Sequence, residues 1–338
     1  MRDKLSEDYI HLANNNYTEL RRIDLKSRLE KNHSGKKRKW PYWVGGFLLL
    51  LLIIVGIGLI YIYDKVSDTA ETMHEPLDRD NNPERQQEIN EAFDEQKSLN
   101  ILLLGVDERT NDDGRSDTMI LLSVNPNVKT IKMLSIPRDT RVRIPGEGED
   151  KINHAYAFGG VELSIQTVEE MLGLSVHFYA KVNMEGFHQG IDALGGVTLS
   201  NERAFSQGGY DFPTGEIHLN GDEALSYTRM RKGDPRGDIG RNERQRNVIQ
   251  AAINEAASFS SVTKVTNILD IIGDNVKTDL DFEQMRTLFT DYRQARESID
   301  SMELSGSGQY IGDIWYYIVP DEEINRAQNE LRNHMEAR

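Results

Sequence analysis

The chain has no cysteine and no excess of basic residues, and it lacks several common catalytic motifs. Without cysteine it has no disulfides and no thiolate metal sites. It contains no P-loop, no GxGxxG after a predicted strand, no GxSxG and no HExxH motif. Its 338 residues carry a formal net charge of -15, which argues against a nucleic-acid-binding protein. The eight histidines are scattered, and we assign no metal to them; His154, near several arginines, is either a ligand-side donor or a loop residue.

One long apolar run interrupts this charged sequence. Residues 43–63 read WVGGFLLLLLIIVGIGLIYIY and contain no charged side chain. As a helix the run would be about 31 Å long, close to the roughly 30 Å of a bilayer's hydrocarbon core. Aromatic residues lie at both ends, as is typical of membrane interfaces. We therefore predict a transmembrane signal anchor over residues 41–63.

The distribution of charge predicts the orientation of this anchor. Residues 1–40 hold 11 basic and 6 acidic side chains, whereas residues 64–338 hold 29 basic and 49 acidic ones, a net charge of -20. Basic residues remain on the cytoplasmic side. The chain is thus predicted to lie in the cell membrane, with a basic cytoplasmic tail at 1–40 and its C-terminal domain outside the cell.

The outer part divides into a polar segment and a domain. Residues 64–98 are poor in apolar side chains and predict a stalk, with a helix near 84–97. Short apolar runs predict buried strands at 101–106, 118–124 and 131–136, and their short connections predict an antiparallel meander. Residue patterns predict further strands at 177–182 and 314–319, and helices at 161–172, 184–194, 220–230, 241–258, 262–272, 282–295 and 322–335. The sequence therefore predicts one α/β domain over 99–338, with a central mixed, largely antiparallel sheet covered by helices.

The meander places charged residues at one edge of this sheet. Asp107 follows the first strand, Arg115 and Asp117 begin the second, and Arg138 follows the third. Because neighbouring strands run antiparallel, these side chains should converge. Carboxylates beside guanidinium groups fit a divalent metal next to a phosphate group. An ordinary salt-bridge cluster at a sheet edge is the alternative.

A second polar cluster surrounds the start of the predicted helix 241–258. Its apolar face, extended back by one and two turns, arrives at Gln245 and Arg241. Polar side chains on an inward face need a partner, and a helix N-terminus attracts anions. Arg229 and Arg231 precede this helix in the segment YTRMR. The pattern therefore favours an anion-binding site.

At these residues the chain resembles the LytR–CpsA–Psr family of cell-envelope enzymes. The similar segments occur in order, and they are spread across about 150 residues of the chain. They are NILLLGVDERTN at 100–111, GRSDTMILLS at 114–123, LSIPRDTR at 134–141, KINHAYAFGGV at 151–161, VNMEGFHQGIDALGGVT at 182–198, LNGDEALSYTRMRK at 219–232 and DIGRNERQRNVIQ at 238–250.

The resemblance implies a transferase that moves a teichoic acid or similar glycopolymer from undecaprenyl pyrophosphate onto the muramic acid C6 hydroxyl of peptidoglycan. It implies that Asp107 and Asp117 hold Mg²⁺ (or Mn²⁺). The family's pyrophosphate-binding residues correspond to Arg109, Arg115, Arg138, Arg229, Arg231, Arg241 and Gln245, and Arg138, Arg229 and Arg231 are also expected in catalysis with the two aspartates. Candidates for the wall of the family's lipid pocket are Leu121, Leu163, Val182 and Ile249, each with an ordinary core position as the alternative.

Three other functions remain open at this stage. A pyrophosphatase would use the same residues, with water in place of the sugar hydroxyl. A membrane-bound regulator of envelope genes is the second, although the 40-residue tail contains no helix-turn-helix. A lipid-binding module without catalysis is the third. The residue that accepts the proton of the attacking hydroxyl is not identified.

Overall fold

The computed structural model describes residues 67–106, 114–231, 233–256, 273 and 275–338, together with residues 21, 22 and 26. The predicted cytoplasmic tail and anchor, the helix at 262–272, and Asp107 and Arg109 lie outside the described residues, apart from those three positions in the tail. Within the described ranges, no helix has the length and apolar character needed to cross a membrane.

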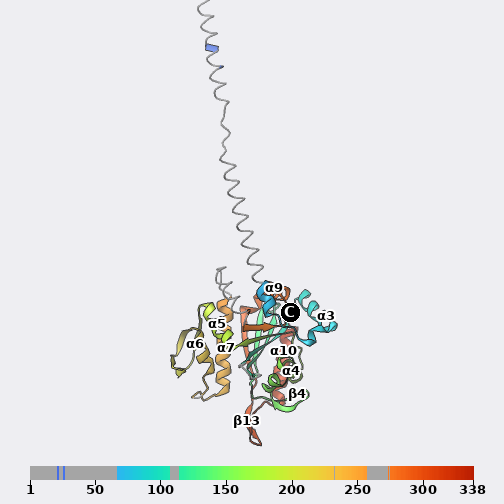
Figure 1. Cartoon of the computed structure of the whole chain (residues 1–338), viewed down its shortest axis with the longest axis vertical. Helices are drawn as coiled ribbons and strands as arrows, with labels where there is room; N and C mark the ends of the chain where they lie inside the picture. The colour runs from blue at the N-terminus through green and yellow to red at the C-terminus, as the bar shows by residue number, and fades with distance from the viewer. Residues whose placement is uncertain are drawn as a thin grey trace, which may run out of the picture. The chain divides into compact units, whose positions relative to one another are not determined.

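A six-stranded mixed sheet forms the centre of the domain (Figure 1). The predicted meander is confirmed, because β1 (Leu99–Val106), β2 (Ser116–Asn125) and β3 (Thr130–Ser135) pair antiparallel in sequence order. The sheet is extended on both sides by strands that are distant in sequence, two of them parallel to their neighbours. These are β6 (Phe178–Asn183) beside β1, β11 (Val276–Thr278) beside β6, and β12 (Ser298–Glu303) beside β3.

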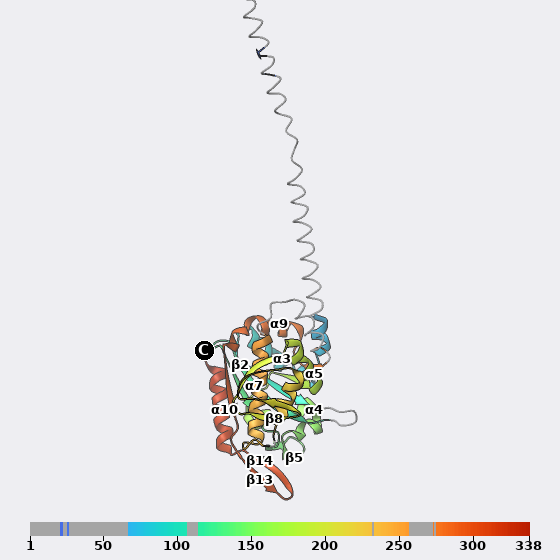
Figure 2. The ribbon, with the colours of Figure 1, turned by 90° about the vertical axis from the view of Figure 1, so that its left-hand side faces the viewer.

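Helices cover both faces of this sheet (Figures 1 and 2). Alternation along the strands sends Leu102, Leu104 and Leu121 into one core, which α4 (His154–Leu172) and α10 (Asp321–Glu336) complete. Residues such as Ile120 and Leu122 face the opposite core, which α3 (Pro83–Asp94) and α9 (Phe282–Asp291) help to form. A third cluster joins α5 (Met184–Leu194), α6 (Gly221–Arg229) and α7 (Asp238–Ala256) to a hairpin of β7 (Val197–Asn201) and β10 (Gly215–Leu219).

The helix predictions that fall on described residues agree with the structure to within about three residues, except that α9 ends at Asp291, four residues before the predicted end, and that α4 begins earlier than predicted. This helix begins at His154, seven residues before the predicted start at residue 161. Gly159 and Gly160 were expected to precede the helix, but they form a kink within it, with φ of -152° and 62°. Since glycine adopts a positive φ without steric penalty, the chain bends there and then continues as a helix.

Several short hairpins were not predicted from the sequence. They are β4 (Arg141–Ile144) with β5 (Gly148–Lys151), β8 (Phe205–Gln207) with β9 (Tyr210–Phe212), and β13 (Ser307–Ile311) with β14 (Ile314–Ile318). Their strands are only three to five residues long, too short for a clear alternating pattern. The strand predicted at 314–319 corresponds to β14.

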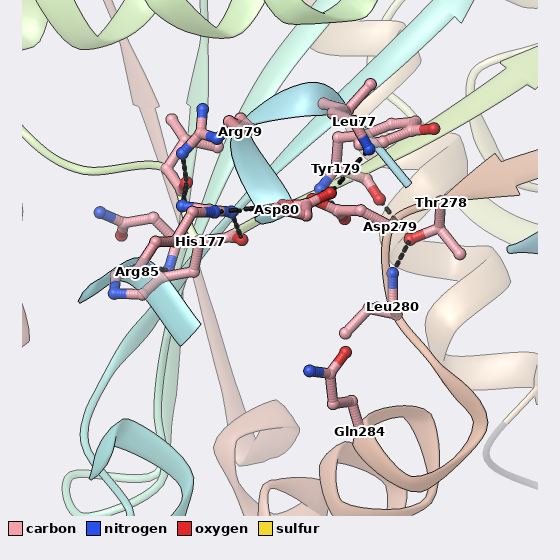
Figure 3. Close-up of polar contacts among 12 residues, drawn as sticks. Leu77, Arg79, Asp80, Arg85, His177, Tyr179, Thr278, Asp279, Leu280 and Gln284 are labelled. Carbon is pink, nitrogen blue, oxygen red and sulfur yellow. Dashed lines mark hydrogen bonds and ion pairs between the residues drawn. The ribbon is translucent and has the colours of Figure 1, made fainter. Parts of the chain in front are cut away.

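Residues of the predicted stalk segment pack against the domain through a polar network (Figure 3). Arg85 donates hydrogen bonds to Asp80 and to the carbonyl oxygen of His177, the latter at 2.5 Å. Arg79 donates to the carbonyl oxygen of Val176. Burial, with repulsion by Arg85 and Arg79, lowers the pKa of His177 to about 4, so its ring is neutral and accepts a hydrogen bond from a backbone N–H at the start of β1.

The same network reaches the segment after β11. The Asp279 carboxylate accepts the backbone N–H of Tyr179 at 2.9 Å, and its other oxygen lies 3.8 Å from Arg85 Nη2. Thr278 donates its hydroxyl to the carbonyl oxygen of Tyr179. Residues 75–85 are thereby connected to β6 and to the turn that follows β11 (Figure 3).

Candidate active site

A cavity of about 500 Å³ lies between the central sheet and helices α5, α6 and α7. Its walls are mostly apolar. They include Leu103 from β1, Val182 from β6, Phe187 and Ile191 from α5, and Val276 from β11. A cavity of this size with a few polar groups is typical of a site for a largely apolar ligand.

Four of the polar side chains that line this cavity were predicted as site residues from the sequence. They are Asp117 at the start of β2, Arg229 at the end of α6, and Arg241 and Gln245 in the first turns of α7. Along α7, Arg241, Gln245 and Ile249 succeed one another at intervals of four residues and all line the cavity, followed by Ala252 and Ile253. The stripe predicted from the sequence is therefore present, and one helix face supplies both the charged and the apolar part of the site.

Asp117 and Arg138 form an ion pair at the sheet edge, as the meander predicts. Arg138 Nη1 lies 2.5 Å from Asp117 Oδ1. The register with β1 shifts between Gly105 and Val106, so that Asp117 is the unpaired residue of a β-bulge. Bulges redirect side chains next to active sites. Burial lowers the pKa of Arg138, but the attraction of Asp117 and its hydrogen bond outweigh this effect, and the net shift is upward.

Asp238 is a member of the cluster that the sequence analysis did not identify. This first residue of α7 lies 2.8 Å from Arg231 Nε and 3.4 Å from Arg241 Nη2. Burial lowers the pKa of Arg241, and Asp238 partly offsets that shift. An acidic residue in the first turn, three positions before an arginine, is a sequence signal that could have revealed it.

A buried ion pair fixes the connection between α6 and α7. Arg244 donates to Asp234 at 2.7 Å and to the carbonyl oxygen of Met230 at 2.6 Å. Its guanidinium lies over the ring of Phe205, 5.3 Å from the centroid. Gly240 is required here, because a β-carbon at that position would lie 2.0 Å from an oxygen of Asp234. These contacts hold the loop that carries Arg231 against the start of α7.

The remaining predicted residues are distributed between the cavity and its surroundings. Arg115 is exposed and precedes β2, and Arg231 is half exposed beside Asp238. Val182 and Ile249 line the cavity. Leu121 is fully buried in the core beneath α4 and α10, and Leu163 packs against that core, so neither lines the cavity. The reason is strand alternation, which turns Leu121 toward the opposite face of the sheet from the cavity.

The chain that forms this cavity belongs to a known family. Residues 60–333 match the LytR_cpsA_psr family model, and the chain is a member of that family. A protein of Oceanobacillus iheyensis, named polyisoprenyl-teichoic acid–peptidoglycan teichoic acid transferase TagU, is 59% identical over 92% of this chain and 99% of its own length.

Solved structures agree with this assignment. The crystal structure of B. subtilis TagU is 44% identical, covers 72% of this chain and 98% of its own, and superposes with a TM-score of 0.59. A structure of TagT bound to LIIa-WTA is 33% identical, covers 71% of this chain and 91% of its own, and has a TM-score of 0.62.

Proposed function

We propose that this protein transfers an anionic glycopolymer, wall teichoic acid or a similar polymer, from undecaprenyl pyrophosphate to the muramic acid C6 hydroxyl of peptidoglycan. The relatives named as teichoic acid transferases and the TagT complex support this activity. The observation that carries the proposal is the composition of the cavity: one continuous space is apolar along most of its wall and bears Arg229, Arg241 and Gln245. A polyprenyl chain joined to a diphosphate has the same two parts.

In this proposal the arginines bind the diphosphate and stabilise the charge that develops on it. The acceptor hydroxyl forms a bond to the sugar-bearing phosphorus, and the bond from that phosphorus to the oxygen of undecaprenyl phosphate breaks. Negative charge then accumulates on the non-bridging and leaving oxygens. Arg138 is held by Asp117 and Arg241 by Asp238, and Arg229 lines the cavity beside them. Such preorganised charge is usually the largest catalytic contribution.

Asp117 orients Arg138, and Asp238 orients Arg231 and Arg241. The nitrogen–oxygen distances are 2.5 Å for the first pair and 2.8 and 3.4 Å for the other two. Arg241 is almost fully buried, and a buried guanidinium requires a negatively charged partner. A diphosphate that enters the cleft supplies further negative charge to the same donors.

Mg²⁺ (or Mn²⁺) belongs to the proposal at Asp117, with Asp107 as its second ligand. A carboxylate together with phosphate oxygens is the kind of hard-oxygen ligand set that Mg²⁺ takes, and Asp117 lines the cavity beside the arginines. Within the described ranges, no group of three acidic or histidine side chains is arranged to hold a metal. When bound, the ion would neutralise charge on the phosphate oxygens.

The proposed location is the outer face of the cell membrane, with residues 41–63 as the anchor. This location would keep the lipid-linked substrate and the catalytic domain at the same bilayer. The described domain begins at Ser67, and residues 72–75 contact residues 277 and 278, next to the cavity-lining Val276. The chain thus enters the domain next to the wall of the proposed lipid cavity.

The test uses the purified full-length chain in detergent with Mg²⁺, an undecaprenyl-pyrophosphate-linked glycan and peptidoglycan. A new phosphodiester between glycan and peptidoglycan is the expected product. Replacing Arg241 with glutamine should lower the transfer rate by about 10²- to 10³-fold, as for the loss of one preorganised donor. Arg293→Gln, at an exposed position in a separate segment, is the matched control and should keep the wild-type rate.

Two results would contradict the proposal. Release of free phosphorylated polymer without a glycan-linked product would identify a pyrophosphatase. Full transfer activity in Arg241→Gln, with its fold confirmed by circular dichroism, would remove the arginine from the mechanism.

A further inference from the structure

Four side chains outside the cavity form a second polar and aromatic cluster. His154 Nδ1 lies 2.8 Å from Asp150 Oδ2, and the hydroxyl of Tyr316 donates to Asp150 Oδ1 at 3.4 Å. The ring of Phe158 lies edge-on to that of His154, with the centroids 6.0 Å apart. Lys151 adjoins Asp150 in β5. We call Asp150, Lys151, His154 and Phe158 the acceptor patch.

Phe158 is exposed at a place where the backbone departs from regular helix. Half of its surface is accessible, and it directly precedes the kink at Gly159 and Gly160 in α4. The bend is sterically specific, since a β-carbon on Gly159 would lie 2.7 Å from the Leu163 side chain. The kink therefore places this aromatic ring at the surface, directly before the point where the helix bends.

The acceptor patch is connected to Arg138 by direct contacts. Lys151 Nζ lies 2.8 Å from Asp139 Oδ1, and Asp139 Oδ2 lies 3.6 Å from Arg138 Nε. The backbone N–H of Asn153, next to His154, donates to the carbonyl oxygen of Arg138 at 3.2 Å. These contacts connect the acceptor patch to Arg138, the proposed phosphate-binding arginine.

The acceptor patch and the lipid cavity lie on different sides of the sheet. No residue of the patch lines the cavity. Helix α4 packs on the face that carries Leu102 and Leu121, whereas α5 and α7 lie on the other side (Figure 1). A sugar bound at the patch would therefore lie outside the cavity and near Arg138, whereas the lipid part of the donor is proposed to lie inside it.

We propose that the acceptor patch binds a sugar ring of the acceptor glycan, an inference that rests on the proposed function. An exposed aromatic ring offers an apolar surface to the C–H face of a sugar. The carboxylate, the imidazole and the ammonium group beside it are donors and acceptors for sugar hydroxyls. The donor polymer also contains sugars, and separate KM values for the donor and the acceptor distinguish these two sources.

The experiment compares full-length wild-type protein with Phe158→Ala in detergent. A soluble peptidoglycan fragment is the acceptor, and a prenyl-diphosphate-linked saccharide is the donor. We expect the KM for the acceptor fragment to rise about fivefold to tenfold, as for loss of one aromatic contact, with the donor KM unchanged. The matched control is Phe289→Ala in α9, since Phe289 is 79% exposed and lies outside the patch, and it should leave both constants unchanged.

A binding measurement without donor separates this inference from the proposed function. Calorimetry with the fragment alone should show weaker binding to Phe158→Ala than to the wild type, by the same factor, whether or not transfer occurs. Equal binding of the fragment to both proteins would overturn the acceptor patch even if the wild type transfers polymer. A rise in the donor KM alone would assign the patch to the donor's sugars and would also overturn the proposal.

Discussion

The pKa of the buried Asp279 carboxyl group can be tested through the pH dependence of stability. This group lies 3.8 Å from Arg85, in the segment before β1. Burial raises the pKa of Asp279 from the ordinary 3.8 to about 7, and repulsion by Asp80 adds to the shift. The folded protein therefore favours the protonated acid, whereas the unfolded chain ionises at about pH 4. Stability from this group is fully present below pH 4 and is lost as the pH rises toward 7.

The size of the loss follows from the two pKa values. A difference between 3.8 and about 7 corresponds to about 4 kcal/mol of unfolding free energy. In Asp279→Asn the side chain cannot ionise, and an amide oxygen can still accept the N–H of Tyr179. We therefore expect the wild type to lose about 4 kcal/mol more stability than Asp279→Asn between about pH 4 and pH 8.

Urea unfolding of the two full-length proteins at both pH values measures this quantity. The quantity compared between the two proteins is the change in unfolding free energy between the two pH values. Any cost of the amide side chain that does not depend on pH therefore cancels. Asp313→Asn, in the exposed turn between β13 and β14, is the control and should follow the wild type. If Asp279→Asn and the wild type lose the same stability across this range, the carboxyl is ionised in the folded protein and the reasoning is refuted.

Two further predictions concern the cavity and the loop beside it. Ala252→Trp should fill part of the cavity next to Ile249 and raise the KM for a long-chain prenyl donor about tenfold, the equivalent of roughly two lost methylene contacts. The KM for a short-chain donor analogue should rise less, and equal effects on both donors would show that the prenyl chain binds elsewhere. Arg244→Met should leave the buried Asp234 with Arg236 as its one charged partner among the described residues, and it should cost about 3 kcal/mol in urea unfolding. Adding Asp234→Asn should recover part of this loss, and a fully additive double variant would show that the two groups do not interact.

Much of the arrangement around the cavity could be predicted from local patterns. The period of the α-helix was enough to place Arg241, Gln245 and Ile249 on one face of α7, because that spacing is a property of the helix itself. Short connections between three apolar runs were enough to bring Asp117 and Arg138 to one edge, because such connections permit only antiparallel neighbours. The anchor prediction, its orientation and the roles of Asp107 and Arg109 concern residues outside the described ranges and stay predictions.

Other features depend on contacts between distant parts of the chain. Alternation in β2 put Leu121 and Leu122 on opposite faces, each in a packed core, and only the packing of helices far apart in sequence decided that a cavity remains open elsewhere along the sheet. The contact of Asp150 with Tyr316 joins residues that are 166 positions apart in the sequence, and neither segment alone contains a pattern that predicts it. The bulge at Asp117 also could not be predicted from the sequence, because it is defined by the pairing register of β2 with β1.

The sequence by itself determined which residues face inward on each helix and strand, and which stretch was apolar enough to predict an anchor, since both depend on near neighbours in the chain. Only the tertiary structure decided where a cavity remains open, that Asp238 joins the arginines, and that Phe158 precedes a kink in α4. Those outcomes depend on the packing free energy summed over segments far apart in sequence, which no local pattern contains.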